Sequence, residues 1–127
     1  VPYKITELPD VKNAGRLPEA EQKELEGKQI LSKLTASDYV ILLDENGEEY
    51  TSRSFSKKLE KWMGMGRKRI FFVVGGPYGF SEAVYERSEG MVSLSKMTFN
   101  HEMVRLFFTE QIYRAMTILR GEPYHHD

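Results

Sequence analysis

The sequence contains no cysteine, which excludes disulfide bonds, zinc–thiolate sites and cysteine nucleophiles. No apolar run approaches the roughly 20 residues that a membrane-spanning helix requires, and no signal peptide is visible. No spacing of histidine and acidic side chains suggests a metal site. We therefore expect a cytoplasmic protein that uses no metal and has no contact with a membrane.

A large charge of one sign is also lacking, because 18 basic and 19 acidic side chains leave a formal net charge of −1. No strong overall field draws such a protein to nucleic acid, so a nucleic-acid site would have to be a local patch. One dense basic group is present, and it consists of Lys57, Lys58, Lys61, Arg67, Lys68 and Arg69. It is either a phosphate-facing patch or the solvated end of a helix, which is the commoner role of such a group.

The chain of 127 residues, 40% of them hydrophobic, suits one domain with a modest core. Continuous apolar runs over residues 39–43 and 70–74 predict strands buried on both faces, as in parallel sheets covered by helices. Asn46-Gly47 predicts a turn after the first of these strands. Further strands are predicted over residues 5–8 and 91–94, and helices over residues 18–34, 52–63, 82–88 and 101–120. This alternation predicts an α/β fold with a mostly parallel sheet.

Three loops follow the carboxyl ends of predicted strands, at residues 43–44, 75–79 and 95–99. Ligands of open α/β sheets bind at those ends. Gly75-Gly76 would let a backbone approach a ligand closely, but a tight turn also accounts for two glycines. The spacing of known phosphate-binding loops is absent. The loops therefore predict a small-molecule site without identifying an activity.

The start of the last predicted helix is polar. Asn100 is suited to cap this helix, and His101 follows either as a functional group or as half of a surface pair with Glu102. Arg105 and Arg114 could hold a carboxylate or a phosphate, or could be solvated or paired within the protein. Patterns and spacing alone leave these alternatives open.

Five segments taken together resemble the RlmH family, the small bacterial SPOUT methyltransferases of the large ribosomal subunit. The segments are residues 43–47, 72–81, 94–101, 110–115 and 123–125. They occur in order and at matching spacing over nearly the whole chain. The Ser-Leu-Ser-Lys-Met-Thr run at residues 93–98 and the Pro-Tyr-His run at residues 123–125 are specific to that family.

The resemblance implies an α/β knot, in which the C-terminal segment threads through a loop to form a trefoil. It also implies an obligate homodimer that uses S-adenosylmethionine to methylate N3 of a pseudouridine in 23S ribosomal RNA, within the assembled ribosome. Family members usually begin with an additional strand and helix, so residues 1–127 would form a single SPOUT domain that lacks this part. The alternative is a knotted module that binds a nucleotide or ribosomal RNA without catalysis.

The family's functional positions transfer residue by residue. The cofactor would contact Leu43, Gly75, Leu94, Ser95, Lys96, Met97, Thr98 and Phe99. The candidates for deprotonating the substrate and holding RNA are His101, Arg105, Tyr124 and His125. In knotted dimers of this type, the tail of one subunit reaches the cofactor pocket of the other. Two departures from the family are Asn100, where many relatives carry proline, and His126, where they carry a basic residue.

Overall fold

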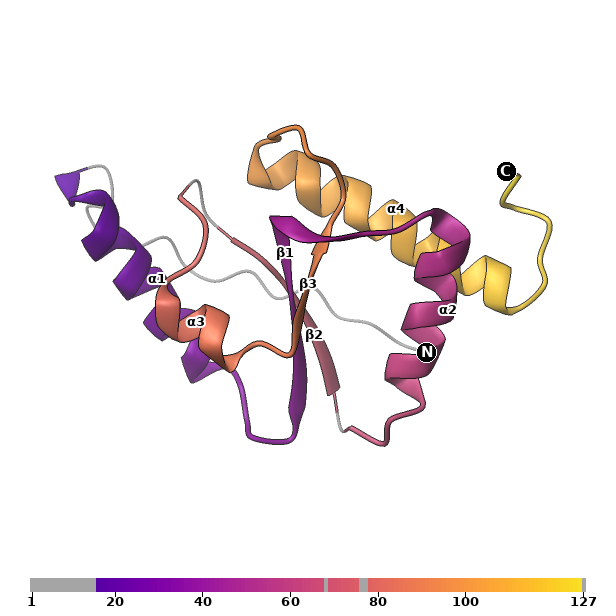
Figure 1. The fold of residues 1–127 in the computed structure, drawn as a ribbon, viewed down its shortest axis with the longest axis horizontal. Helices are drawn as coiled ribbons and strands as arrows, with labels where there is room; N and C mark the ends of the chain where they lie inside the picture. Colours follow the sequence, from indigo (N-terminus) through magenta and orange to yellow (C-terminus); the bar gives the residue numbers. More distant parts are fainter. Residues whose placement is uncertain (1–15, 68, 76–77, 127) are drawn as a thin grey trace.

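The computed structural model describes residues 16–67, 69–75 and 78–126. Three parallel strands form a sheet in the order β2-β1-β3, with helices on both faces (Figure 1). The strands are β1 (Asp38–Glu49), β2 (Arg69–Val74) and β3 (Gly90–Ser93). The helices are α1 (Glu19–Ser32), α2 (Ser52–Met63), α3 (Glu82–Arg87) and α4 (His101–Leu119). The predicted α/β class is confirmed, whereas the strand predicted over residues 5–8 lies outside the described residues. The trefoil knot rests on the family resemblance.

The central strand β1 is buried on both faces, as its apolar run predicted. Ile41 and Leu43 pack toward α2 and α4, whereas Val40 and Leu42 pack toward α3 and α1. This alternation follows from the two-residue period of a strand. The four side chains are between 0% and 7% exposed, so β1 holds both helical layers, which Figure 1 shows on opposite sides of the sheet.

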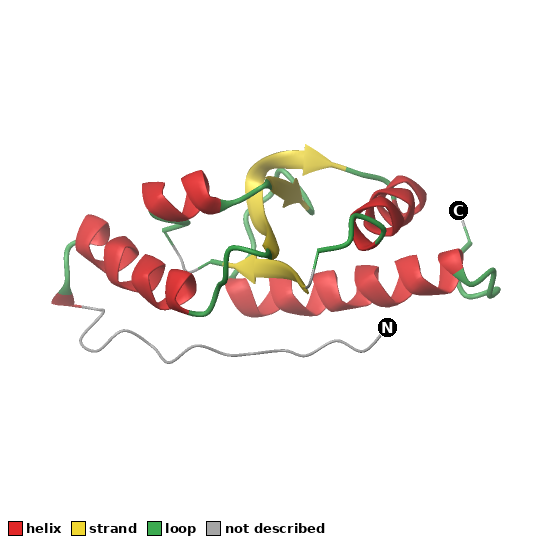
Figure 2. Ribbon diagram, turned by 90° about the horizontal axis from the view of Figure 1, so that it is seen from below, coloured by secondary structure: helices red, strands yellow, loops and turns green. Residues whose placement is uncertain are grey.

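The prediction of a turn at Asn46-Gly47 is wrong, because β1 continues through these residues to Glu49. The register against β3 shifts within this part, so that Leu43 and Glu48 both pair with Val92. A Cβ atom on Gly47 would lie 2.7 Å from backbone atoms of β3. Glycine is therefore needed here for close contact of two backbones. The longest strand in Figure 2 curves accordingly.

Aromatic rings fasten α2 and α4 to the sheet. The ring of Phe72 on β2 lies 4.8 Å from that of Phe108 on α4 and 6.0 Å from that of Trp62 on α2. The ring of Phe55 on α2 lies 5.9 Å from that of Phe108 and 6.3 Å from that of Trp62. Phe107 was predicted to lie on the apolar face of α4, but it is 38% exposed.

Polar side chains cap three helices. Ser81 and Asn100 accept hydrogen bonds from the first turns of α3 and α4, which confirms the predicted cap at Asn100. Thr51, instead of Ser52, caps α2 through a reciprocal pair of bonds with Ser54. Pro18 immediately precedes the first residue of α1.

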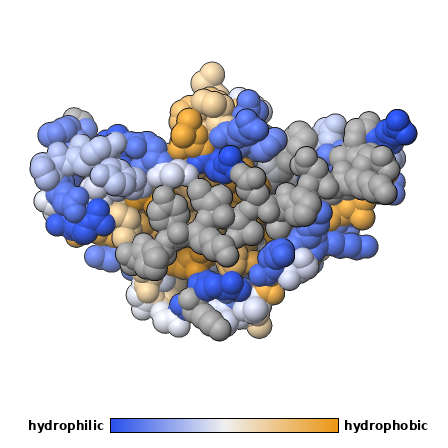
Figure 3. Space-filling view, turned by 180° about the vertical axis from the view of Figure 1, so that it is seen from behind, coloured by the Kyte–Doolittle hydropathy of each residue, from blue (hydrophilic) through white to orange (hydrophobic). Residues whose placement is uncertain are grey.

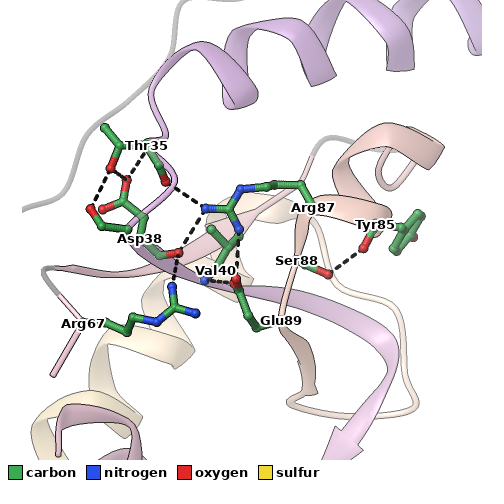
Figure 4. Close-up of polar contacts among 9 residues, drawn as sticks. Thr35, Asp38, Val40, Arg67, Tyr85, Arg87, Ser88 and Glu89 are labelled. Atoms are coloured by element: carbon green, nitrogen blue, oxygen red, sulfur yellow. Dashed lines mark hydrogen bonds and ion pairs between the residues drawn. The ribbon is translucent and has the colours of Figure 1, made fainter. Parts of the chain in front are cut away.

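An ion pair between a buried carboxylate and a half-exposed guanidinium joins β1 to β2 at their amino ends. The side chain of Asp38 is fully buried and accepts hydrogen bonds from Arg69 Nε at 2.9 Å and Nη2 at 3.0 Å. The backbone N–H of Thr35 adds a third bond at 2.7 Å. The backbone carbonyl of Asp38 accepts hydrogen bonds from Arg67 at 3.3 Å and from Arg87 at 3.0 Å (Figure 4). The bonds from Arg69 and Thr35 lower the pKa of Asp38 below its ordinary value.

A second carboxylate, directly before β3, completes this network. Glu89 accepts a hydrogen bond from the backbone N–H of Val40 and another from Arg87 Nη1 at 3.0 Å (Figure 4). Arg87 also donates to the carbonyl of Thr35 at 2.9 Å. The amino ends of the sheet are thus held by charged groups, which leaves the carboxyl ends to the loops.

We expect Asp38→Asn to destabilise the protein by about 2 kcal/mol at pH 7, because it removes charge-assisted hydrogen bonds to a buried carboxylate. The pKa of Asp38 is lowered in the folded state, so the pair stabilises the fold above the ordinary aspartate pKa. This contribution is lost as the pH falls through the lowered value. Urea unfolding at several pH values should show the difference from wild type shrinking below about pH 4.

Glu49→Gln provides the matched control, because Glu49 lies 3.9 Å from Lys96 in an exposed ion pair. Such pairs contribute little to stability, so this variant should unfold like the wild type. Equal effects of the two substitutions would show that burial of Asp38 does not give its ion pair special weight.

Candidate functional site

A cavity of about 320 Å³ lies where the carboxyl end of β3 faces α2 and α4. Its walls come from three segments and one ring: Tyr50, Thr51, Ser52 and Phe55, then residues 92–95, then Phe107, Phe108, Glu110 and Gln111 of α4, and Phe99. Its volume is at the lower end of the range for small-molecule sites. Mostly apolar walls with a few polar groups suit a ligand with a flat ring and a charged end.

Only part of the predicted cofactor set lines this cavity. Leu94, Ser95 and Phe99 lie in its wall, and the ring of Phe99 packs edge-on against Phe107 with centroids 5.4 Å apart. The Met97 side chain is 73% exposed. The cavity walls thus include the family-specific turn but not all of its side chains.

The turn at residues 93–99 is held by its own hydroxyl groups. Ser93 Oγ donates to the carbonyl of Ser95, and Ser95 Oγ accepts from the N–H of Met97, both at 2.9 Å. Thr98 Oγ1 donates to Glu45 at 3.3 Å. These hydroxyls shape the loop and tie it to β1.

Leu43 and Gly75 lie beside this turn, because the carboxyl ends of parallel strands meet at one edge. Leu43 pairs with Val74 on β2 and with Val92 on β3. Gly75 follows Val74 directly, and a Cβ atom on it would lie 3.0 Å from the ring of Phe80. Glycine thus allows a side chain to pack against the loop backbone. Gly76 and Pro77 lie outside the described residues.

Sequence reasoning missed a contact that ties α3 to β1. The hydroxyl of Tyr85 on α3 donates to the carboxylate of Asp44, which follows Leu43. Burial, followed by this bond, raises the pKa of Tyr85 to about 12. Tyr85 also packs edge-on against Phe80 at 5.7 Å. No local pattern connects residues 44 and 85.

The C-terminal tail folds back onto α4. Arg114 donates to Glu110 and, at 3.0 Å, to Nδ1 of His125, and its guanidinium lies 5.0 Å from the ring centre of Tyr124. The hydroxyl of Tyr124 donates to Glu110 Oε2 at 3.1 Å. Tyr113 packs against Tyr124 at 4.9 Å. We call Glu110, Arg114, Tyr124 and His125 the C-terminal cluster.

This cluster adjoins the cavity, because Glu110 belongs to both. The bond to Glu110, followed by burial, raises the pKa of Tyr124, so its phenol is a poor proton acceptor at neutral pH. Because Arg114 can only donate, Nδ1 of His125 must accept, and the proton of the neutral ring then lies on Nε2.

Within one chain, His101 and Arg105 do not join Tyr124 and His125. Both lie exposed in the first two turns of α4. Nine residues separate His101 from Glu110, which corresponds to about 14 Å along the helix axis. The four predicted catalytic residues therefore form two groups.

The described residues also bear on two other kinds of site, metal centres and membrane-spanning helices. No group of three or more histidine or acidic side chains in residues 16–67, 69–75 and 78–126 could hold a metal ion. Among the helices described above, none is long and apolar enough to span a membrane.

Comparison with known proteins places this chain in a family. A family model described as "Predicted SPOUT methyltransferase" matches residues 1–125. "Ribosomal RNA large subunit methyltransferase H" from Parabacteroides distasonis is 59% identical over 127 residues, which are 100% of this chain and 81% of that protein. Proteins of the same name from Flavobacterium johnsoniae and Bacteroides thetaiotaomicron are 57% and 49% identical, over 99% and 100% of this chain and 80% and 81% of theirs. The chain therefore belongs to the RlmH family of SPOUT methyltransferases.

Proposed function

We propose that this protein methylates large-subunit ribosomal RNA, at N3 of a pseudouridine in 23S RNA, with S-adenosylmethionine as the methyl donor. The observation that carries the proposal is the 59% identity, over the full chain, to a protein named as a ribosomal RNA large subunit methyltransferase. The substrate is the assembled ribosome, which places the reaction in the cytoplasm. Residues 1–127 act as one SPOUT domain.

The cofactor would be held at the carboxyl ends of the three strands. Leu43, Gly75 and the turn at residues 94–99 surround this position, and Leu94 and Phe99 supply apolar wall to the adjoining cavity. When bound, S-adenosylmethionine supplies a methyl group already activated by the sulfonium charge, so no metal is needed. The chain's task is to position the acceptor nitrogen and to help its proton leave.

The C-terminal cluster suits stabilisation of a developing anion better than abstraction of a proton. N3 of pseudouridine is a weak acid, so its anion must be stabilised as the proton leaves. His125 would present Nε2–H as a donor, because Arg114 occupies Nδ1. Tyr124, whose pKa is raised, would stay protonated and position the pseudouridine ring. His101 and Arg105 remain candidates for contact with RNA.

The homodimer is supported by apolar side chains on the outer surface of α4. Met103, Leu106 and Phe107 are 38–60% exposed, and Met97 in the preceding turn is 73% exposed. Figure 3 shows hydrophobic side chains gathered at the top of the molecule, the end at which Figure 1 places the start of α4. Such patches mark association sites. In a dimer, the tail of one subunit would reach the first turns of α4 in the other.

Incubation with S-adenosylmethionine and ribosomes that lack the modification should add one methyl group, identified as N3-methylpseudouridine by mass spectrometry of the RNA. Ribosomes incubated without the cofactor provide the control. If calorimetry shows cofactor binding but the ribosomal RNA stays unmethylated, the rRNA substrate is wrong. Absence of both would favour the non-catalytic module.

Tyr124→Ala should lower kcat about 100-fold, the usual scale for loss of a group that assists proton transfer. The dissociation constant for S-adenosylmethionine should change less than about threefold, because Tyr124 lies on the substrate side. Tyr124→Phe keeps the ring contacts with Arg114 and Tyr113 and should retain part of the activity. Equal losses of cofactor binding and of kcat would contradict a substrate-side role.

Leu106→Glu should convert the dimer to monomer at micromolar concentration, because it places a charge in an apolar interface. Sedimentation velocity measures the change. Lys28→Glu, on the exposed surface of α1, serves as the control and should leave the dimer intact. A monomeric wild type, or a Leu106→Glu variant of unchanged mass, would show that α4 does not form the interface.

A further inference from the structure

Basic side chains are concentrated in one part of a chain that is slightly acidic overall. Seven of the 18 lysines and arginines lie in residues 53–69, which contain one acidic residue, Glu60. The formal net charge of the whole chain is −1. The remainder of the protein is therefore clearly acidic, and this segment is the main basic one.

Some of these side chains serve the fold. Arg69 binds the buried carboxylate of Asp38, and Arg67 lies 5.5 Å from the ring centre of Tyr39. The ammonium of Lys58 lies 5.9 Å from the ring centre of Trp62. These contacts account for three of the basic groups by packing and ion pairing, as expected for a solvated helix end.

The remaining cations on α2 are arranged differently. Arg53, Lys57 and Lys61 are exposed and follow each other at intervals of four residues, so they form one row along the helix. We call these three side chains the α2 row. Within the described part of the chain, no salt bridge includes Lys57 or Lys61.

The spacing of the α2 row brings like charges together, although Lys61 lies in the last turn, where a cation favours the helix. Like charges four residues apart destabilise a helix by about 0.2–0.5 kcal/mol per pair, whereas alternating signs would stabilise it. The row is also not needed to cover the apolar face of α2, because Phe55, Leu59 and Trp62 are already buried in the core at 4–5% exposure. A row of this kind therefore favours contact with an anionic partner.

The α2 row begins at the rim of the candidate site. Thr51, Ser52 and Phe55, which flank Arg53, line the cavity. Ser52 also donates to Gln111 of α4 at 2.8 Å, which fixes the start of α2 against the cavity wall. From there the row extends about 12 Å along the helix. A nucleic-acid strand that approaches the site beside the cavity could thus lie along α2 (Figure 1).

We propose that the α2 row binds phosphates of the ribosomal RNA strand that flanks the target nucleotide. This proposal rests on the proposed function and identifies one surface through which the substrate is held. An anionic membrane fits less well, because the apolar side of α2 is buried in the core and cannot insert. Phosphate contacts of this kind position a strand without reading its sequence.

The test compares Lys57→Gln/Lys61→Gln with Lys28→Gln/Lys33→Gln, a pair of exposed lysines on the opposite side of the sheet. Binding to ribosomes is measured by co-sedimentation at several salt concentrations. The α2 double variant should bind about tenfold more weakly, and the slope of log affinity against log salt should fall by about 1.5 to 2. The control pair should bind like the wild type.

Further measurements separate this proposal from the proposed function. Calorimetric binding of S-adenosylmethionine and the melting temperature should be unchanged in the α2 variant, because its row is not part of the cavity or the core. If the α2 variant binds ribosomes with unchanged affinity and salt slope and still methylates them, the proposed role of the α2 row is wrong, whereas the proposed function stands. Weaker binding by the variant supports the row even if no methylation is detected. Row-dependent binding to phosphatidylserine vesicles, with ribosome binding unaffected, would overturn it in favour of a membrane.

Discussion

Burial of β1 on both faces is the constraint on which the rest of the structure depends. Ile41 and Leu43 anchor α2 and α4, and Val40 and Leu42 anchor the opposite layer. Because β1 lies between β2 and β3 in parallel, Leu43 lies beside Val74 and Val92, where the two neighbouring strands lead into their loops. The charged network of Asp38 and Glu89 closes the other end of the sheet. The candidate site thus lies where the sheet is held by loops instead of ion pairs.

The fold was largely predictable because its core follows simple periodicities. Continuous apolar runs identified β1 and β2, and the cap Asn100 marked the start of α4. The one clear error, at Asn46-Gly47, has a physical reason. A glycine that reverses the chain and a glycine that allows contact between two backbones have the same local sequence. Only the position of β3, more than 40 residues away, distinguishes them.

The site was predictable only through the resemblance, and only in part. Residue spacing pointed to the strand ends but could not connect Asp44 with Tyr85, or Glu110 with Tyr124. Those contacts depend on how loops and tail fold over the sheet, which leaves no periodic signal. The resemblance supplied the residues of both proposed groups, yet a single chain keeps His101 apart from His125. Their separation is the expected consequence if the active site is completed by a second subunit.

A net charge of −1 also determines how this protein can recognise RNA. Without a long-range field, attraction acts only within about 8 Å, the screening length at physiological salt. The proposed α2 row would engage phosphates only where a surface already presents them at matching positions. Flexible naked RNA must lose conformational entropy to do so, whereas an assembled ribosome holds its strands in place. A weakly charged enzyme with a short basic row is therefore suited to a folded ribonucleoprotein substrate.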